Sequence, residues 1–104
     1  MILTTSEDIV GREIIETIGL VRGNAARARG IGYDITAGIR NIFGGAVPEY
    51  EKLITVARDE ATAAMVRSAE QAGADAIVSV RYTTSMISQG VSEILAFGTA
   101  VKLR

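Results

Sequence analysis

The sequence contains no cysteine and no histidine among its 104 residues, and it has no tryptophan and only one proline. The lack of cysteine excludes disulfides, thiolate chemistry and cysteine metal sites. The lack of histidine removes the commonest metal ligand and the commonest acid–base group. Neither sign of charge dominates, because 11 basic and 12 acidic residues give a formal net charge of −1. Such a chain has no overall field that attracts a nucleic acid or an anionic membrane, so we expect neither as a partner.

Long hydrophobic runs are also absent. No apolar run reaches about 18 residues, the length that a membrane-spanning helix needs, although the mean hydropathy is +0.27. Residues 1–8 have neither the basic nor the apolar part of a secretory signal. With 48% hydrophobic and 22% charged residues, the composition is that of a globular chain. We therefore expect a single cytoplasmic domain over residues 1–104.

The strongest local pattern predicts an amphipathic helix over residues 47–73. Pro48 suits a first helical position and Gly73 suits the left-handed conformation that ends a helix. Apolar residues recur at steps of three and four between them: Tyr50, Leu53, Ile54, Ala57, Ala61, Ala64, Met65, Ala69 and Ala72. Because most of these side chains are small, the helix can lie close to a flat sheet.

Three further segments have the composition of strands. Residues 13–22 are rich in β-branched and aliphatic side chains on both faces, and residues 75–86 and 93–103 alternate apolar and polar positions. Gly90 can reverse the chain between the last two. At most a brief strand is expected before them, at Ile2 and Leu3.

The connection between the first strand and the long helix carries glycine and two arginines. We interpret residues 24–33 as a loop and residues 35–43 as a short helix. Asp34 is a candidate N-cap of this helix, and Gly44 follows its last apolar residue.

This order of elements predicts an α+β fold with a two-layer β-α-β-β subunit. A helical crossover and a tight turn would place the third strand between the first and second, which gives an antiparallel three-stranded sheet in the order 1-3-2. Ala96, Gly98 and Ala100 would face the helix. The opposite face would carry Leu95, Phe97 and Val101, and a single helical layer cannot cover it. Two unpaired edge strands and this bare face predict a closed homo-oligomer.

Several segments together carry a family resemblance. They are Arg27-Ala28-Arg29-Gly30-Ile31-Gly32, Asp34-Ile35, Ala37-Gly38, Ile42-Phe43-Gly44-Gly45, the helix with Tyr50 and Arg58, Gly73-Ala74-Asp75-Ala76-Ile77 and Gly98-Thr99-Ala100-Val101. The chain resembles the YbjQ-like family of small bacterial and archaeal proteins over nearly its whole length. The resemblance implies a dodecin-like subunit that assembles into a ring of five. The family also carries a heavy-metal-binding label, and its biochemical function is not assigned.

The residues of this chain fit that label poorly. Soft heavy metals select thiolate, imidazole and thioether ligands, of which the chain has only the thioethers of Met1, Met65 and Met86. The nearest carboxylate pairs are Glu7 with Asp8, Glu49 with Glu51, and Asp59 with Glu60, and we interpret them as solvated surface residues. We therefore assign no metal residues and no cofactor.

An anion site is the remaining candidate for a ligand. Arg27 and Arg29, beside Gly30 and Gly32 and before the Asp34 cap, could bind an anion with guanidinium and backbone N–H groups. The alternative is that these arginines form salt bridges or carbonyl contacts within or between subunits. Arg81 invites that second interpretation, with Glu16 or Glu93 as cross-strand partners.

No catalytic constellation is evident. The hydroxyls of Thr83, Thr84 and Ser85 have no histidine to act as a base, and Lys52 and Lys102 lie in no pocket-forming segment. We therefore do not expect the chain to be an enzyme. We expect an oligomeric, and by the resemblance pentameric, binding or scaffold protein with a small anion or metal at its subunit interfaces. The alternatives are a purely structural assembly and an enzyme.

Overall fold

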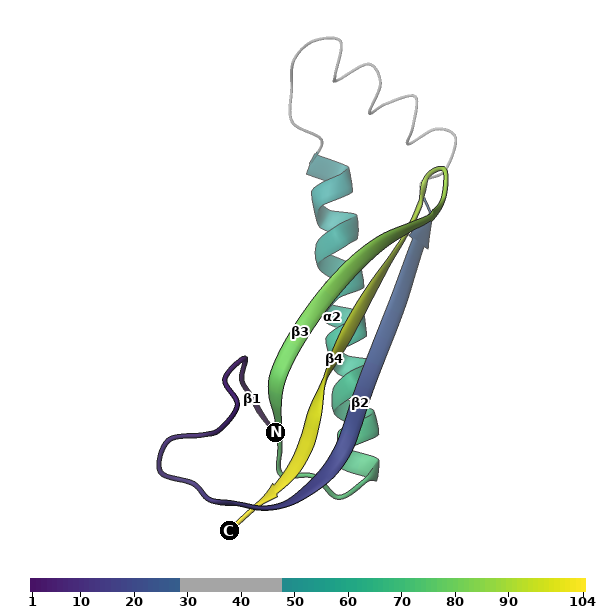
Figure 1. Cartoon of the computed structure of the whole chain (residues 1–104). Coiled ribbons are helices and arrows are strands. Elements are labelled where there is room, and N and C mark those ends of the chain that lie inside the picture. Colours follow the sequence, from purple (N-terminus) through teal and green to yellow (C-terminus); the bar gives the residue numbers. More distant parts are fainter. Residues whose placement is uncertain (29–47) are drawn as a thin grey trace.

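The computed structural model describes residues 1–28 and 48–104, in which one long helix packs on one face of a curved sheet (Figure 1). The elements run in the order β1 (Ile2–Leu3), β2 (Ile14–Ala28), α2 (Pro48–Gln71), β3 (Ala76–Ser88) and β4 (Val91–Leu103). The short helix predicted at residues 35–43 lies outside the described residues. Within the described residues, no helix is both long and apolar enough to cross a membrane.

The sheet is mixed and has four strands, in the order β1-β3-β4-β2. Its three long strands pair antiparallel with β4 between the other two, as the connections predicted. The prediction of a purely antiparallel three-stranded sheet is wrong, because β1 adds a fourth strand parallel to β3. Only Ile2 and Leu3 form this strand, and a pairing of two residues leaves no periodic pattern in a sequence.

The helix α2 ends as its sequence predicts. Gly73 has a φ of 81°. Its N–H donates to the carbonyl of Glu70 at 3.0 Å, and the N–H of Ala74 donates to that of Ala69 at 3.0 Å. This pair of bonds is a Schellman motif, which satisfies carbonyls left over at the helix end. Ala72 was predicted to face the sheet but is exposed, because it belongs to this last, tightened turn.

Small residues bring the helix close to the sheet. Ala57, Ala61, Met65 and Ala69 are buried on α2, and they form one core cluster with Val21 and Ala25 of β2, Ile77 and Val80 of β3, and Ile94, Ala96 and Ala100 of β4. The closest approach is at Gly23 of β2, where an added Cβ would collide with the Ala61 carbonyl oxygen and the Met65 nitrogen. A side chain at this position would push the helix off the sheet.

Strand β2 is longer than predicted, and a bulge along its length changes which of its residues face the helix. Residues 24–28 were expected in a loop, but they continue the ladder with β4, Asn24 opposite Leu95 for example. The register shifts next to Gly19, whose φ is 139°. This bulge places both Ile18 and Val21 on the helix side, so the predicted strict alternation fails there. Leu20 is left 70% exposed on the other face.

Among residues 1–28 and 48–104, the face opposite the helix is covered at one end only. Val101 and Leu103 are buried there with Ala76 and Val78, and Ile9 of the N-terminal segment packs against this second cluster together with Ile14. The expectation that Val101 needs a second subunit is therefore wrong, since the chain's own N-terminal segment covers it. Leu95 and Phe97, farther along β4, remain half-buried.

The β3–β4 hairpin is also longer than predicted. Ser88 lies opposite Val91, so only Gln89 and Gly90 form the turn. Gly90 has a φ of 77°, a conformation that glycine adopts without steric cost. Ile87 and Ser88, expected in the connection, extend β3 instead. The two strands therefore project beyond the part of the sheet that is covered on both faces (Figure 1).

Candidate functional site

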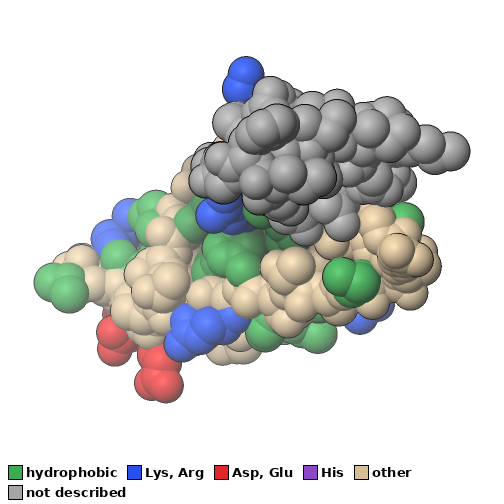
Figure 2. Space-filling model, turned by 90° about the horizontal axis from the view of Figure 1, so that it is seen from above, with side chains coloured by type: hydrophobic (Ala, Val, Ile, Leu, Met, Phe, Trp, Pro, Cys, Tyr) green, Lys and Arg blue, Asp and Glu red, His purple; other side chains and the backbone are tan. Residues whose placement is uncertain are grey.

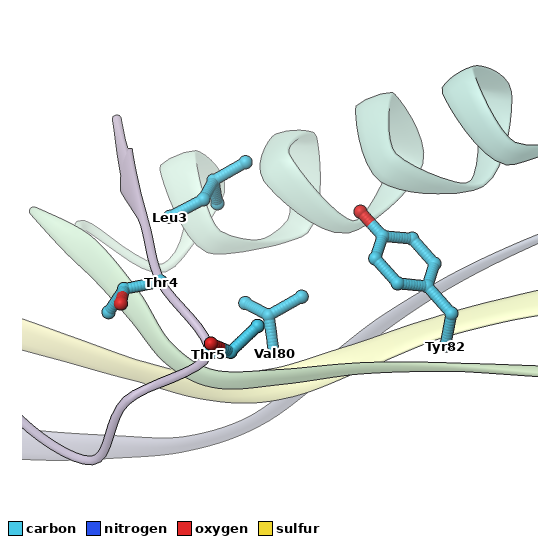
Figure 3. A pocket seen from close by; sticks show the side chains of 5 residues that line it. All are labelled: Leu3, Thr4, Thr5, Val80 and Tyr82. Carbon is cyan, nitrogen blue, oxygen red and sulfur yellow. The ribbon is translucent and has the colours of Figure 1, made fainter.

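An apolar cavity of about 220 Å³ lies beside the outer edge of β3 and is lined by Leu3, Thr4, Thr5, Val80 and Tyr82. Leu3, Val80 and Tyr82 all point from the sheet toward the helix (Figure 3). The cavity exists because α2 lies mainly against β2, less against β4, and barely touches β3. Among the described residues, the helix thus covers β3 at Ile77 and Val80 and leaves the helix side of Leu3 and Tyr82 partly exposed.

A hydroxyl pair closes the rim of this apolar cavity. Tyr82 Oη lies 2.9 Å from Thr62 Oγ1, and Thr62 Oγ1 donates to the carbonyl of Arg58 at 2.8 Å. Because a threonine hydroxyl has a single proton, Tyr82 is the donor to Thr62. The remaining polar groups of the lining belong to Thr4 and Thr5. Such a lining suits an uncharged, largely apolar group, and among the lining residues that the structure describes there is no base that could activate a nucleophile.

A second, polar cavity of about 310 Å³ lies on the face opposite the helix, between β2 and β4. Arg22, Asn24, Glu93 and Leu95 line it. The guanidinium, amide and carboxylate groups can bind a small polar molecule by hydrogen bonds. This group was not predicted, because the first strand was expected to end at residue 22. Asn24 then had no assigned place opposite Leu95.

The predicted anion residues are only partly described by the structure. Arg27 lies in β2 opposite Ser92. Arg29, Gly30 and Gly32 lie outside the described residues, so the anion site stays a prediction.

The expected partners of Arg81 are corrected. Arg81 lies opposite Phe97 in the ladder, not opposite Glu16 or Glu93. Its guanidinium donates to the carbonyls of Thr5 at 2.9 Å and of Val80 at 2.8 Å. Arg81 therefore ties the N-terminal segment to β3, a carbonyl contact within one subunit.

The donor groups of this chain do not fit a soft heavy metal. Over residues 1–28 and 48–104, no three Asp, Glu, His or Cys residues gather where they could hold a metal ion. The thioethers are dispersed as well. Met65 is fully buried in the core, whereas Met1 precedes β1 and Met86 is exposed on β3.

Large apolar side chains are exposed mainly at the two edges of the sheet. Apart from Val56 on the helix, those that the structure describes lie in the N-terminal segment, β2 and β3, and none lies on the central strand β4: Met1, Ile2, Leu3, Val10, Ile15, Leu20, Tyr82, Met86 and Ile87. Seen from above, hydrophobic side chains lie on the surface beside lysine and arginine side chains (Figure 2). Exposed apolar surface of this kind is typical of an interaction site.

Comparison with known structures supports the fold. A solved protein of unknown function from Pediococcus pentosaceus, assigned to the DUF74 family, superposes with a TM-score of 0.62. The match covers 100% of this chain and 98% of the other at 15% sequence identity. The long helix on a mixed sheet is therefore an arrangement that a solved structure shares.

Comparison with known sequences identifies the family. A UPF0145 protein of Halorubrum lacusprofundi is 53% identical over the full length of both chains. A UPF0145 protein of Shewanella frigidimarina is 54% identical over 99% of this chain and 96% of its own. The YbjQ family model, described as "Putative heavy-metal-binding", matches residues 1–104. By family model and by full-length relatives, this chain belongs to the YbjQ-like, UPF0145 family.

Proposed function

We propose that this chain is the subunit of a closed homo-oligomeric binding or scaffold protein that holds a small ligand between its copies. The observation that carries the proposal is the exposure of large apolar side chains along both edges of the sheet and not on its central strand. Fully burying a large apolar side chain stabilises by roughly 1.5–3 kcal/mol relative to leaving it exposed. Most of these side chains are partly exposed, so a second copy that covers them would stabilise the assembly by a part of that amount for each.

The number of copies is proposed from the family. A ring of five is what the resemblance to YbjQ-like proteins implies, whereas the sheet edges alone are equally compatible with other closed numbers. Light scattering coupled to gel filtration tests this part. We expect one peak at about five times the chain mass of 11.0 kDa. A monodisperse peak at one chain mass that persists on dilution contradicts the assembly.

An anion is the ligand that the side chains favour over a metal. Arg22 lines the polar cavity, and the predicted site at Arg27 and Arg29 adds guanidinium groups, which bind anions through paired N–H donors. The thiolate and imidazole ligands that soft metals select are missing from the sequence. Elemental analysis of the purified protein should find zinc, copper and cadmium well below one per subunit. Tight binding of one such ion per subunit by calorimetry would contradict this preference.

The alternative is a purely structural assembly. Native mass spectrometry separates the two functions, because a ligand copurifying in a fixed ratio supports a binding protein. An intact oligomer without any such ligand favours the structural alternative. An enzyme would require turnover that is lost on replacing one polar interface residue.

A further inference from the structure

The polar cavity on the face opposite the helix carries both signs of charge. Its lining consists of Arg22 and Asn24 from β2 and Glu93 and Leu95 from β4. Asn24 lies directly opposite Leu95 in the ladder. Arg22 is two residues away toward one end of the sheet, and Glu93 is two residues away toward the other. Because side chains two residues apart on a strand share a face, all four project from the same surface.

The two charges in this cavity do not neutralise each other. Among residues 1–28 and 48–104, neither the Arg22 guanidinium nor the Glu93 carboxylate forms an ion pair. The register gives the reason, because the two residues lie four positions apart along the ladder, about 14 Å between Cα atoms at about 3.4 Å per residue. Asn24 and Leu95 occupy the level between them. The cavity therefore has a positive end, a negative end and a partly apolar floor.

A second arginine on this face is already occupied. Arg81 of β3 lies opposite Phe97, as Arg22 of β2 does on the other side. Its guanidinium donates to the carbonyls of Thr5 and Val80. Arg22 has no such carbonyl partner among the described residues, so its donors are directed to solvent or to a ligand.

We infer that this cavity binds a small zwitterion whose carboxylate and ammonium groups are separated by an apolar spacer, the chemical class of an ω-amino acid. The ligand carboxylate would accept paired N–H bonds from Arg22, and its ammonium group would donate to Glu93. The spacer would cross Leu95, which is half-buried, beside the Asn24 amide. The inference rests on the proposed binding function and names a ligand class for this cavity. It does not depend on the assembly, because all four residues belong to one chain.

Ligands with one charge fit the cavity less well. A simple anion at Arg22 leaves the Glu93 carboxylate unpaired and adds a like charge near it, and a simple cation at Glu93 does the same to Arg22. An α-amino acid carries both charges on one carbon, so it is short for a pair of residues two ladder levels apart. A spacer of several methylene groups satisfies both ends.

Titration calorimetry with a series of small molecules tests the ligand class. The probes are 5-aminopentanoate, pentanoate without the ammonium group, pentylamine without the carboxylate, and glycine without the spacer. A hydrogen bond to a charged group contributes about tenfold or more in affinity. We therefore expect 5-aminopentanoate to bind at least tenfold more tightly than each of the other three.

Charge-removing variants test the assigned ends of the cavity. Glu93→Gln should weaken the binding of 5-aminopentanoate at least tenfold without weakening that of pentanoate, whereas Arg22→Gln should weaken both. The matched controls are Arg67→Gln and Glu70→Gln, since both residues are exposed on α2, on the other side of the sheet. The controls should change either affinity by less than twofold. Urea midpoints equal to that of the unmodified chain verify that each variant is folded.

The outcomes separate this inference from the proposed function. Pentanoate or glycine binding as tightly as 5-aminopentanoate, or equal effects of Glu93→Gln and Glu70→Gln, overturns the zwitterion site and leaves the proposed preference for an anion standing. Absence of 5-aminopentanoate binding also overturns the site. Native mass spectrometry then judges the proposed function by itself, because a ligand copurifying in a fixed ratio upholds a binding protein. An intact oligomer without such a ligand overturns both.

Discussion

The two halves of β3 differ in composition and in surroundings, because residues 76–80 are apolar except for Ser79 and residues 81–88 are mostly polar. From Ala76 to Val80 every residue except Ser79 is buried, whereas from Arg81 to Ser88 every residue is exposed. Both halves nevertheless pair with the same strand β4. Strand formation and burial are therefore separate properties in this sheet. The first follows from pairing and the second from what covers each face.

The covering layers explain where the change occurs. Near Ala76 and Val78 the N-terminal segment packs Ile9 against one face, and on the other face Ile77 and Val80 contact the helix core. Ser79 lies at the change, with a φ of 54° and its N–H donating to the Ser6 carbonyl at 2.8 Å. A bulge there shifts the register between Val78 and Arg81. Beyond it, β3 leaves the cover of the N-terminal segment and meets the helix through the hydrogen bond of Tyr82 to Thr62.

The largest expected effect compares two methionines from the two regions. Met65→Ala removes a fully buried side chain from the core and should lower the free energy of unfolding by about 2–5 kcal/mol. Met86→Ala removes a side chain that is 70% exposed in one copy. At a concentration where the chains are dissociated, it should cost less than about 0.5 kcal/mol. Urea denaturation measures both, and equal midpoints for the two variants would contradict the assigned core.

A smaller effect is expected at Gly98. A Cβ there would lie 2.7 Å from Ile77 Cγ2 and 3.0 Å from the Val78 carbonyl oxygen. Gly98→Val should therefore destabilise the fold by about 1–3 kcal/mol through overpacking against β3. Thr83→Val, on the exposed half of β3, is the control and should change stability by less than about 0.5 kcal/mol. An unchanged urea midpoint in Gly98→Val would mean that β3 yields easily at its covered end.

The smallest effect concerns the hydrogen bond that links the exposed half of β3 to the helix. Tyr82→Phe removes the donor to Thr62 and should cost about 0.5–1 kcal/mol, because the phenol is partly exposed. A double-mutant cycle with Thr62→Ala separates the energy of the Tyr82–Thr62 hydrogen bond from that of the bond between Thr62 and the Arg58 carbonyl. A coupling energy of zero would show that the helix and this half of β3 are independent.

The helix and the long strands could be predicted because their signals are local. Pro48 and Gly73 bound α2 through their own backbone preferences, and Ala96 and Ala100 follow simple alternation onto the helix side. The close helix contact was expected at Gly98 and lies at Gly23 instead. That difference depends on how the helix is placed over the sheet, which no single segment encodes.

The candidate cavities could not be predicted for the same reason. Arg22, Asn24 and Glu93 share one cavity only once the register of β2 on β4 is known, and a bulge at Gly19 sets that register. Leu3 meets Val80 and Tyr82 through a pairing of two residues. Both arrangements depend on tertiary contacts, so the residue pattern alone was compatible with several different arrangements.

The pairing of β4 with its two neighbours has a consequence for the order of folding. Its ladder with β3 is closed by Gln89 and Gly90 alone, whereas its ladder with β2 must bring together strands separated by residues 29–90. Loop closure costs more entropy as the loop lengthens, and hairpins form in about 1–10 μs. We expect the β3–β4 hairpin to protect its amides first in pulsed hydrogen exchange, and β2 to protect its amides only when the helix has packed. The outer strand β2 would then be the last to join the sheet and the first to leave it.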